Sequence, residues 1–413
     1  MRLRVAVLVG IFSSFSFGET LGGLLQKVQN NDSLAAQRFY EERALTQKKS
    51  VQSAYYPKLE ATATAYKKAN AVAFEPREVK SAELTASLTL FDGFKREERL
   101  GAADKEANAQ KYKSEFVRQT LGMEVIETYY AYFDALARLE ALDFKLQEVE
   151  SHIKKLTVLV TNDLATKDSL EAMNAAQKES LYEKESAKLY KEEAKLRLEL
   201  LTGAQTGELV WSPLSSPVVE EPNRLDITAD KLSVESLRHA EGLNTYLPTL
   251  ILQGGVKKSA YSTYDDMGGM QKQFENNAQI GAQLNWTLFD FGAISKDREA
   301  AKLQTLAAAK NLAYKENSIK IDAKLKAFAL DAAKARLLAA KSALTATETA
   351  YSYSKKRFEV NLIGYTDFLT ELSKKQDAIS RAKAAKNEVE LAKARLAYAL
   401  GIDITTLTHQ KEK

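Results

Sequence analysis

The tetrapeptide Thr89-Leu90-Phe91-Asp92 occurs a second time as Thr287-Leu288-Phe289-Asp290, 198 residues further along the chain (from 89 to 287). Ala194-Lys195-Leu196-Arg197-Leu198 recurs with the same offset as Ala392-Lys393-Ala394-Arg395-Leu396. One such match could arise by chance, but two in the same register indicate that the chain repeats itself. We therefore interpret the 413 residues as a tandem duplication, in which each half must form the same kind of unit.

Each repeated tetrapeptide ends a stretch in which apolar and polar residues alternate, at 82–90 and at 278–288. Shorter alternating stretches at 59–66 and 250–257 follow a proline in each half. Alternation with period two is typical of strands, and strands of roughly 9–11 residues with one apolar face are typical of outer-membrane barrels. Each half is therefore predicted to contribute one β-hairpin. A pair of hairpins in a soluble sandwich is the alternative.

Apolar residues then recur with the spacing of a coiled coil. In the first half they step by three and four, at Leu139, Leu142, Leu146, Val149, Ile153, Leu156 and Val160. In the second half they recur every seven residues, at Leu330, Leu337, Leu344, Tyr351 and Phe358. No proline, the strongest helix breaker, occurs from 93 to 203 or after 290. We predict helices at 96–161 and 296–361, each about 100 Å long, and returning helices at 168–201 and 367–400.

The composition argues against catalysis. The chain has no cysteine and three histidines, His152, His239 and His409, no two of which are close in sequence. Thiolate chemistry is excluded, and a zinc site is not expected because one His with a nearby Glu gives too few ligands. No phosphate loop or nucleophile motif accompanies the many carboxylates. We predict a protein that is not an enzyme, uses no cofactor or metal, and carries its histidines on the solvated surface.

The N-terminus has the plan of a secretory signal peptide. Arg2 and Arg4 precede an apolar run that ends at Phe17-Gly18. This run is too short to cross a membrane as a helix. Without the two arginines the formal charge falls from +4 to +2, which gives no electrostatic basis for binding nucleic acid. We therefore expect an exported protein with no nucleic-acid partner.

Two strand hairpins and two long helical hairpins in an exported chain pose a physical problem. Four strands cannot close a barrel, and open sheet edges are not tolerated in lipid. If the hairpins span a membrane, several copies must pool their strands, because bacterial barrels begin at about eight strands. The same copies would bundle their long helices into a tube. This arrangement predicts a conduit across the periplasm and the outer membrane.

The residues resemble the TolC-like outer membrane efflux proteins. The resemblance rests on the duplication, on Leu90-Phe91-Asp92 and Leu288-Phe289-Asp290, and on the tips Leu164-Ala165-Thr166-Lys167 and Arg357-Phe358-Glu359-Val360. It implies a mainly α fold with a small transmembrane β part, in which a homotrimer forms a twelve-stranded barrel and an α-helical periplasmic tunnel. It also implies the function, namely the passive exit duct of a tripartite efflux pump or type I secretion system. The implied partners are a periplasmic adaptor, an inner-membrane transporter and outer membrane lipid.

The resemblance also implies roles for residues at the two tips. Those at the periplasmic entrance or gate are Asp367, Asp168 and Phe358. Those at the adaptor-docking surface are Val160, Leu164, Leu362 and Gly364. Three copies of Asp367 would ring the entrance and set a preference for cations. The chain departs from the family pattern at Ser169 and Thr370, where further acidic residues would be expected.

The same residues also permit purely structural roles. Asp367 suits the first turn of a helix, and Gly364 suits a turn. Val160 and Leu362 suit the closure of the coiled-coil seam. Trp286, at the end of the second hairpin, is predicted to lie at the membrane interface, with ordinary strand packing as the alternative.

The division of the chain follows from these elements. We predict a signal peptide at 1–18, a helical segment at 19–57 with one unbroken helix over 21–54, an outer membrane hairpin at 58–92, a periplasmic helical hairpin at 93–203 with its tip near 162–167, a linker at 204–228, a helical segment at 229–247, a second hairpin at 248–290, a second helical hairpin at 291–401 with its tip near 361–366, and a tail at 402–413. An exported coiled-coil scaffold or adaptor without a membrane barrel remains the alternative.

Overall fold

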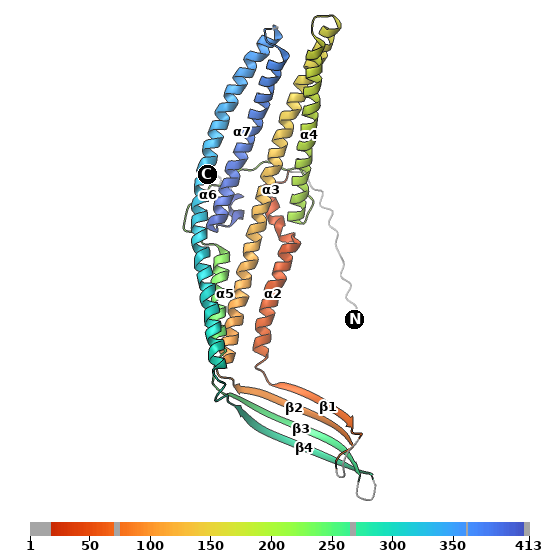
Figure 1. The fold of residues 1–413 in the computed structure, drawn as a ribbon, viewed down its shortest axis with the longest axis vertical. Helices are drawn as coiled ribbons and strands as arrows, with labels where there is room; N and C mark the ends of the chain where they lie inside the picture. The colour runs from red at the N-terminus through yellow and green to blue at the C-terminus, as the bar shows by residue number, and fades with distance from the viewer. Residues whose placement is uncertain (1–17, 70–74, 265–269, 361, 409–413) are drawn as a thin grey trace. The chain divides into compact units, whose positions relative to one another are not determined.

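A computed structural model describes residues 18–69, 75–264, 270–360 and 362–408. The chain divides into two compact units, each built from both halves of the duplication (Figure 1). The first unit comprises 18–37, 114–225 and 316–408, and the second comprises 38–113 and 226–315. Residues 1–17 of the predicted signal peptide and His409 lie outside the described residues.

The second unit contains one antiparallel sheet. Its strands are β1 (Lys58–Lys67), β2 (Glu78–Phe91), β3 (Thr249–Tyr264) and β4 (Met270–Asn285), which lie side by side in this order (Figure 1). The pairing of β1 with β2 and of β3 with β4 confirms the two predicted hairpins. The pairing of β2 with β3, in which Leu84 lies opposite Val256, joins the hairpins into one sheet. The sheet is thus shared by the two repeats.

The register gives this sheet one apolar face. The rows of paired residues on that face are Leu59, Ala86, Gly254 and Ile280; Ala61, Leu84, Val256 and Ala278; and Leu88, Leu252 and Ala282. The opposite face carries rows such as Thr62, Glu83, Lys257 and Asn277. The apolar face is open: Leu84 is 42%, Val256 is 55% and Ile280 is 82% exposed. This chain alone therefore leaves its most hydrophobic sheet surface uncovered.

A tight turn links each hairpin to a long helix. At Asp92-Gly93-Phe94 and at Asp290-Phe291-Gly292 the last two residues adopt left-handed backbone conformations, with φ of +73° and +65° in the first turn and +53° and +86° in the second. Asp290 accepts hydrogen bonds from the backbone N–H of Gly292 (3.0 Å) and of Ile294 (2.8 Å). Its carboxylate therefore satisfies backbone donors at the start of the following helix.

The helices follow the predicted periodicity closely. The long helices α3 (Lys95–Thr161) and α6 (Ala293–Glu359) have 67 residues each, and the returning helices α4 (Lys167–Thr202) and α7 (Tyr365–Leu400) have 36 each. The predicted seam is buried at Leu142, Leu146, Val149 and Leu156. None of the helices in the described ranges is long and apolar enough to cross a membrane.

Strands β2, β3 and β4 run further than predicted toward the hairpin loops, and three other predicted boundaries were wrong. The helix expected over 21–54 is interrupted, giving α1 (Leu21–Lys27), a 3-10 turn η1 (Val28–Asn30) and α2 (Asp32–Ser53). The cause is Asn31, whose Oδ1 accepts from the N–H of Ser33 (2.8 Å) while its Nδ2 donates to the carbonyl of Leu201 (3.0 Å). Asn31 therefore caps α2 and the distant end of α4 together.

The other two corrections concern the second half. Helix α5 (Leu225–Gly242) begins four residues earlier than predicted, so the linker is shorter. Strand β4 ends at Asn285 and not at 288, because its last partner is Thr249 and the preceding Pro248 has no N–H to continue the ladder. The predicted tail contains a 3-10 helix, η2 (Ile404–Thr408).

Both returning helices end at a glycine in the left-handed conformation, Gly203 at φ +63° and Gly401 at φ +79°. A Cβ on Gly401 would lie 2.4 Å from the carbonyl oxygen of Asn223, whose N–H bonds to Leu400. Gly364, by contrast, has an ordinary φ of −78° and open space around its Cα. Its backbone therefore does not require glycine, contrary to the turn role considered above.

These two glycines provide a matched pair of substitutions. We expect Gly401→Ala to lower the free energy of unfolding by at least about 2 kcal/mol, because left-handed strain adds to a backbone clash. Gly364→Ala should change it by less than about 0.5 kcal/mol. Urea unfolding of the purified protein, followed by helical circular dichroism, measures both. Equal losses in the two variants would contradict the packing around Gly401.

Candidate functional site at the helical tips

The two tips are built in the same way. The N–H of Leu164 bonds to the carbonyl of Leu159, and the N–H of Leu362 bonds to the carbonyl of Arg357, both at 2.8 Å. These bonds close the ends of α3 and α6 and turn the chain outward. The side chains of Leu164 and Leu362 are 73% and 67% exposed. The two predicted docking leucines are thus equivalent in the repeats and open to a partner.

The other two docking candidates differ from these leucines. Val160 is half-buried and packs against the apolar cluster beneath the tips. Gly364 is the exposed N-cap residue of α7. Neither presents an apolar side chain as freely as Leu164 or Leu362, so the exposed apolar surface of the tips comes mainly from the two leucines.

The two entrance aspartates lie in the first turns of the returning helices, Asp168 in α4 and Asp367 in α7, and both are exposed. Hydrogen bonds from Thr166 and from backbone N–H groups lower the pKa of Asp168. Thr166, the N-cap residue of α4, also bonds to Ser169 (2.8 Å between hydroxyl oxygens). Asp168 is therefore tied into a helix start, which favours a negative charge.

Phe358 does not face outward in this chain. It is 8% exposed and stacks on Phe368 with ring centroids 4.5 Å apart, and Tyr365 meets it edge-on at 4.7 Å. Residues from four helices complete this cluster, namely Val149 and Leu156 of α3, Met173 of α4, Tyr351 of α6 and Leu372 of α7. The aromatic cluster, as we call this group, holds the two helical hairpins together beneath their tips.

His152 lies in the same cluster, and its predicted place on the solvated surface was wrong. The imidazole is 5% exposed and meets Phe368 at 4.6 Å and Phe358 at 5.0 Å between centroids. The sequence did carry a signal: His152 falls three residues after Val149 and four before Leu156, on the buried stripe of α3. His239 is half-exposed, and its Nδ1 lies 2.8 Å from a carboxylate oxygen of Glu98.

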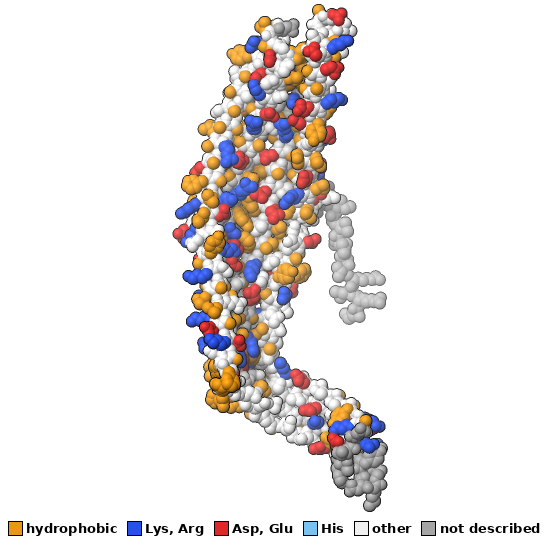
Figure 2. Space-filling view, in the orientation of Figure 1, with side chains coloured by type: hydrophobic (Ala, Val, Ile, Leu, Met, Phe, Trp, Pro, Cys, Tyr) orange, Lys and Arg blue, Asp and Glu red, His pale blue; other side chains and the backbone are white. Residues whose placement is uncertain are grey.

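Trp286 lies just beyond β4 and is 58% exposed, with its Nε1 donating to the carbonyl of Tyr246 (3.0 Å). Leu288, Phe289 and Phe291 beside it are 76%, 73% and 92% exposed. Figure 2 shows hydrophobic side chains gathered where α6 begins next to the sheet. Trp286 is therefore part of an exposed apolar group and not of a packed strand, which suits the predicted membrane interface.

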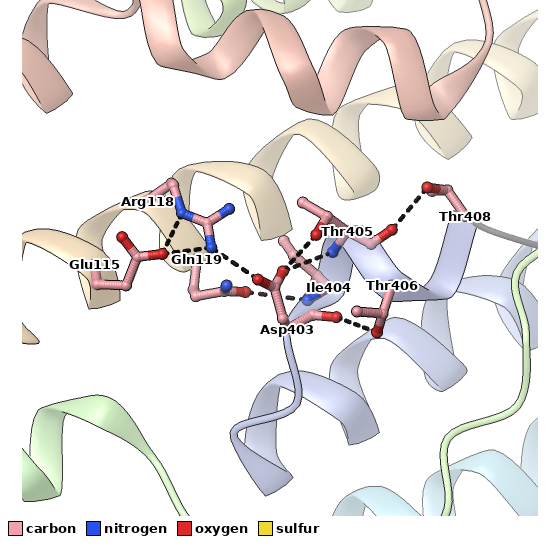
Figure 3. Close-up of polar contacts among 8 residues, drawn as sticks. All are labelled: Glu115, Arg118, Gln119, Asp403, Ile404, Thr405, Thr406 and Thr408. Atoms are coloured by element: carbon pink, nitrogen blue, oxygen red, sulfur yellow. Dashed lines mark hydrogen bonds and ion pairs between the residues drawn. The ribbon is translucent and has the colours of Figure 1, made fainter.

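A polar network holds the end of the chain against α3 (Figure 3). Asp403 accepts hydrogen bonds from the N–H of Thr405 (2.9 Å) and from Arg118 (2.8 Å), and Gln119 accepts from the N–H of Ile404 (3.1 Å). Burial alone would raise the pKa of Asp403, but hydrogen bonds from Gln119, Thr405 and Arg118 lower it to about 2. This network orders the segment that follows α7.

The fold combines two long helical hairpins with one four-stranded antiparallel sheet whose apolar face is exposed. In the described residues no group of His, Asp and Glu side chains could hold a metal ion. Residues 24–155 match the family model described as outer membrane efflux protein, which confirms the predicted resemblance.

Solved structures agree on the fold. The chain is similar to the outer membrane protein VceC of Vibrio cholerae, with a TM-score of 0.79, 18% identity, and coverage of 93% of this chain and 96% of that chain. For the CmeC channel of Campylobacter jejuni the values are 0.78, 16%, 100% and 96%. For the MtrE channel of Neisseria gonorrhoeae they are 0.77, 18%, 94% and 91%. No curated protein matches the chain by sequence.

The Asp403 network predicts a pH-dependent contribution to stability. Because the pKa of Asp403 is lowered from about 3.9, its stabilising effect is present above about pH 4 and is lost as the pH falls toward 2. Its side chain is 39% exposed, so solvent screening limits the effect to about 1 kcal/mol. Asp403→Asn should therefore lower the unfolding free energy at pH 7 and converge with the unmodified protein near pH 2. The control is Asp297→Asn, at an exposed position of α6.

Proposed function

We propose that this protein is the outer membrane channel of a tripartite export system, serving as a passive duct from the periplasm to the outside of a Gram-negative cell. The observation that carries the proposal is the uncovered apolar face of the four-stranded sheet, in a chain whose segment 24–155 matches the outer membrane efflux protein family. In water such a face would promote aggregation, whereas in lipid it is the surface that a barrel needs.

The edges of the sheet supply the reason for an oligomer. Within the described residues β1 pairs only with β2, and β4 pairs only with β3. The sheet of each chain therefore has two edges, β1 and β4, with unpaired backbone groups that lipid does not tolerate. Pairing β4 of one copy with β1 of the next removes both edges. Three copies would give the twelve-stranded barrel implied by the family resemblance.

Two helices carry unpartnered apolar seams that support the same assembly. On α6, Ile321, Leu325 and Phe328 step by four and three residues and are 60%, 59% and 73% exposed. On α4, Leu189 and Leu196 are seven residues apart and are 65% and 64% exposed. Seams of this spacing normally lie against another helix. We assign the missing helices to neighbouring copies, which closes the tunnel.

The tips supply the contacts with partners. Leu164 and Leu362 are apolar, exposed and equivalent in the two repeats, as a docking surface for a periplasmic adaptor requires. An inner-membrane transporter, the partner that the family resemblance implies, would supply the energy. A scaffold without a barrel has no use for the apolar sheet face. Efflux of small compounds and secretion of proteins would both use this duct.

The assembly is tested through its seam. Leu325→Glu combined with Phe328→Glu places two charges against an apolar helix of the neighbouring copy. The proposed trimer should therefore dissociate in mild detergent. The control Val219→Glu changes an equally exposed apolar residue of the linker and should leave the trimer intact. Size-exclusion chromatography with light scattering measures the mass. A soluble periplasmic monomer from the unmodified gene would contradict the proposed function.

The entrance role of Asp367 is tested by ion selectivity. Replacing the three copies with Asp367→Asn should lower the cation-to-anion permeability ratio by roughly a factor of two or more, because neutral amides replace carboxylates at one constriction. Reversal potentials in planar bilayers under a salt gradient measure the ratio. Unchanged selectivity together with a lower melting temperature would assign Asp367 to the start of α7 instead.

A further inference from the structure

His152 occupies the point at which the two helical hairpins meet. It comes from α3, whereas the rings that enclose it, Phe358 and Phe368, come from α6 and α7. The two rings are stacked, with 15° between their planes, and the imidazole lies edge-on to both at 69° and 77°. The imidazole of the first hairpin is thus 5% exposed and in contact with two rings of the second.

A second contact joins the same helices one turn away. Lys355 of α6 donates to Glu148 of α3 at 3.1 Å. The other oxygen of Glu148 lies 3.7 Å from Nε2 of His152, four residues along the same helix. Glu148 is thus placed between a cation of the neighbouring hairpin and an imidazole of its own helix.

The charged groups around the imidazole and its cluster come from three helices. Glu148 and Lys155 belong to α3, Lys355 and Glu359 belong to α6, and Lys375 of α7 lies 4.2 Å from the ring centroid of Tyr351. From α4 and α7 the cluster presents Leu170, Met173, Phe368 and Leu372, together with the phenol of Tyr365 at its edge. Burial lowers the pKa of His152, and the two lysines lower it further against the opposing effect of the two glutamates. The imidazole is therefore neutral at pH 7.

We propose that His152 is a pH-dependent contact between the two helical hairpins. In its neutral form it holds α3 against α6 and α7 beneath the tips, and in its protonated form it releases them. Its effect on transport rests on the proposed channel function, but the release itself does not. The ligand of this site is a proton, and the site senses the pH of the compartment that surrounds the tips.

Two physical effects make the proton act in this direction. An imidazolium at the edge of the stacked Phe358 and Phe368 rings loses hydration that the apolar cluster does not replace. The same imidazolium competes for Glu148, which would then pair within α3 and give up its bond to Lys355 of α6. One proton therefore weakens both contacts between the hairpins.

The pH range follows from linkage. Because the pKa of His152 is lowered when the hairpins are joined, the joined form is favoured at pH values above about 6.5, the ordinary value for histidine. As the pH falls below that value, the separated form gains up to about tenfold for each pH unit, until the joined form itself becomes protonated. Acid should therefore open the seam between the hairpins.

The absence of cysteine from the sequence allows a direct test. Leu156→Cys places a thiol in the aromatic cluster, where the native side chain is 0% exposed, and Leu164→Cys places one at the exposed tip. The ratio of their rates of modification by a methanethiosulfonate reagent cancels the effect of pH on the thiol. From pH 7.5 to 5.5 we expect this ratio to rise about tenfold in the trimer.

His152→Phe, introduced into both cysteine variants, should abolish this rise, because a phenylalanine fits an apolar cluster and binds no proton. His239→Gln, which changes the other described histidine, should leave the rise unchanged. If the ratio falls in acid, the aromatic rings attract the imidazolium and protonation strengthens the contact between the hairpins, which overturns the proposal. A rise that persists in His152→Phe overturns it as well.

Conductance in planar bilayers separates this inference from the channel function. As the pH falls from 7.5 to 5.5, we expect the fraction of time that the channel is open to increase in the unmodified protein and in His239→Gln. In His152→Phe this fraction should stay constant. If the unmodified protein and His152→Phe both conduct, with the same dependence on pH, the proposed role of His152 is refuted and the channel function stands. A protein that never conducts would refute the proposed channel function. The ratio of the two modification rates would still test the pH-dependent contact of His152.

Discussion

The unpaired edges of the four-stranded sheet are the constraint on which the rest of the structure depends. Backbone N–H and C=O groups have no alternative partner in lipid, so in the proposed channel β1 and β4 must each meet a strand from another copy. Each chain must then expose an apolar face on its strands and apolar seams on its helices, because a neighbour or lipid will cover them. The exposed Ile280 and Phe328 are two consequences of this single requirement.

The duplication explains why four strands suffice per chain, but the two repeats are not used alike. Their long helices have equal lengths, as do their returning helices, which end on equivalent glycines. The aromatic cluster, however, takes His152 from the first repeat and most of its rings from the second, and the position equivalent to His152 is Ala350. The repeats therefore meet through unlike residues, so a change at one site can alter their contact without disturbing either helix.

Local patterns predicted most of this fold, and long-range contacts account for what they missed. Heptads and alternation depend on neighbours in the chain, so helices α3, α4, α6 and α7 and the two hairpins were located to within a few residues, except that β2 and the outer ends of β3 and β4 run further than predicted. The pairing of β2 with β3 joins residues more than 150 positions apart and has no local signal. The break at Asn31 arises because its side chain reaches the end of α4. His152 was predicted at the surface because histidine is a polar residue. Its spacing from the buried residues of the heptad indicated the core instead.

The proposed duct can change its state only through ligands that bind its two arrangements with different affinity. The structure separates two places where this can occur. Leu164 and Leu362 lie outside, where a protein partner can reach them, and His152 lies inside, where only a proton or water can. An adaptor and a proton would then act on the same equilibrium between joined and separated hairpins, and by linkage each would change the affinity for the other. Control at the tips would therefore combine a contact from the partner with the pH of the surrounding compartment, without any moving part beyond the helices themselves.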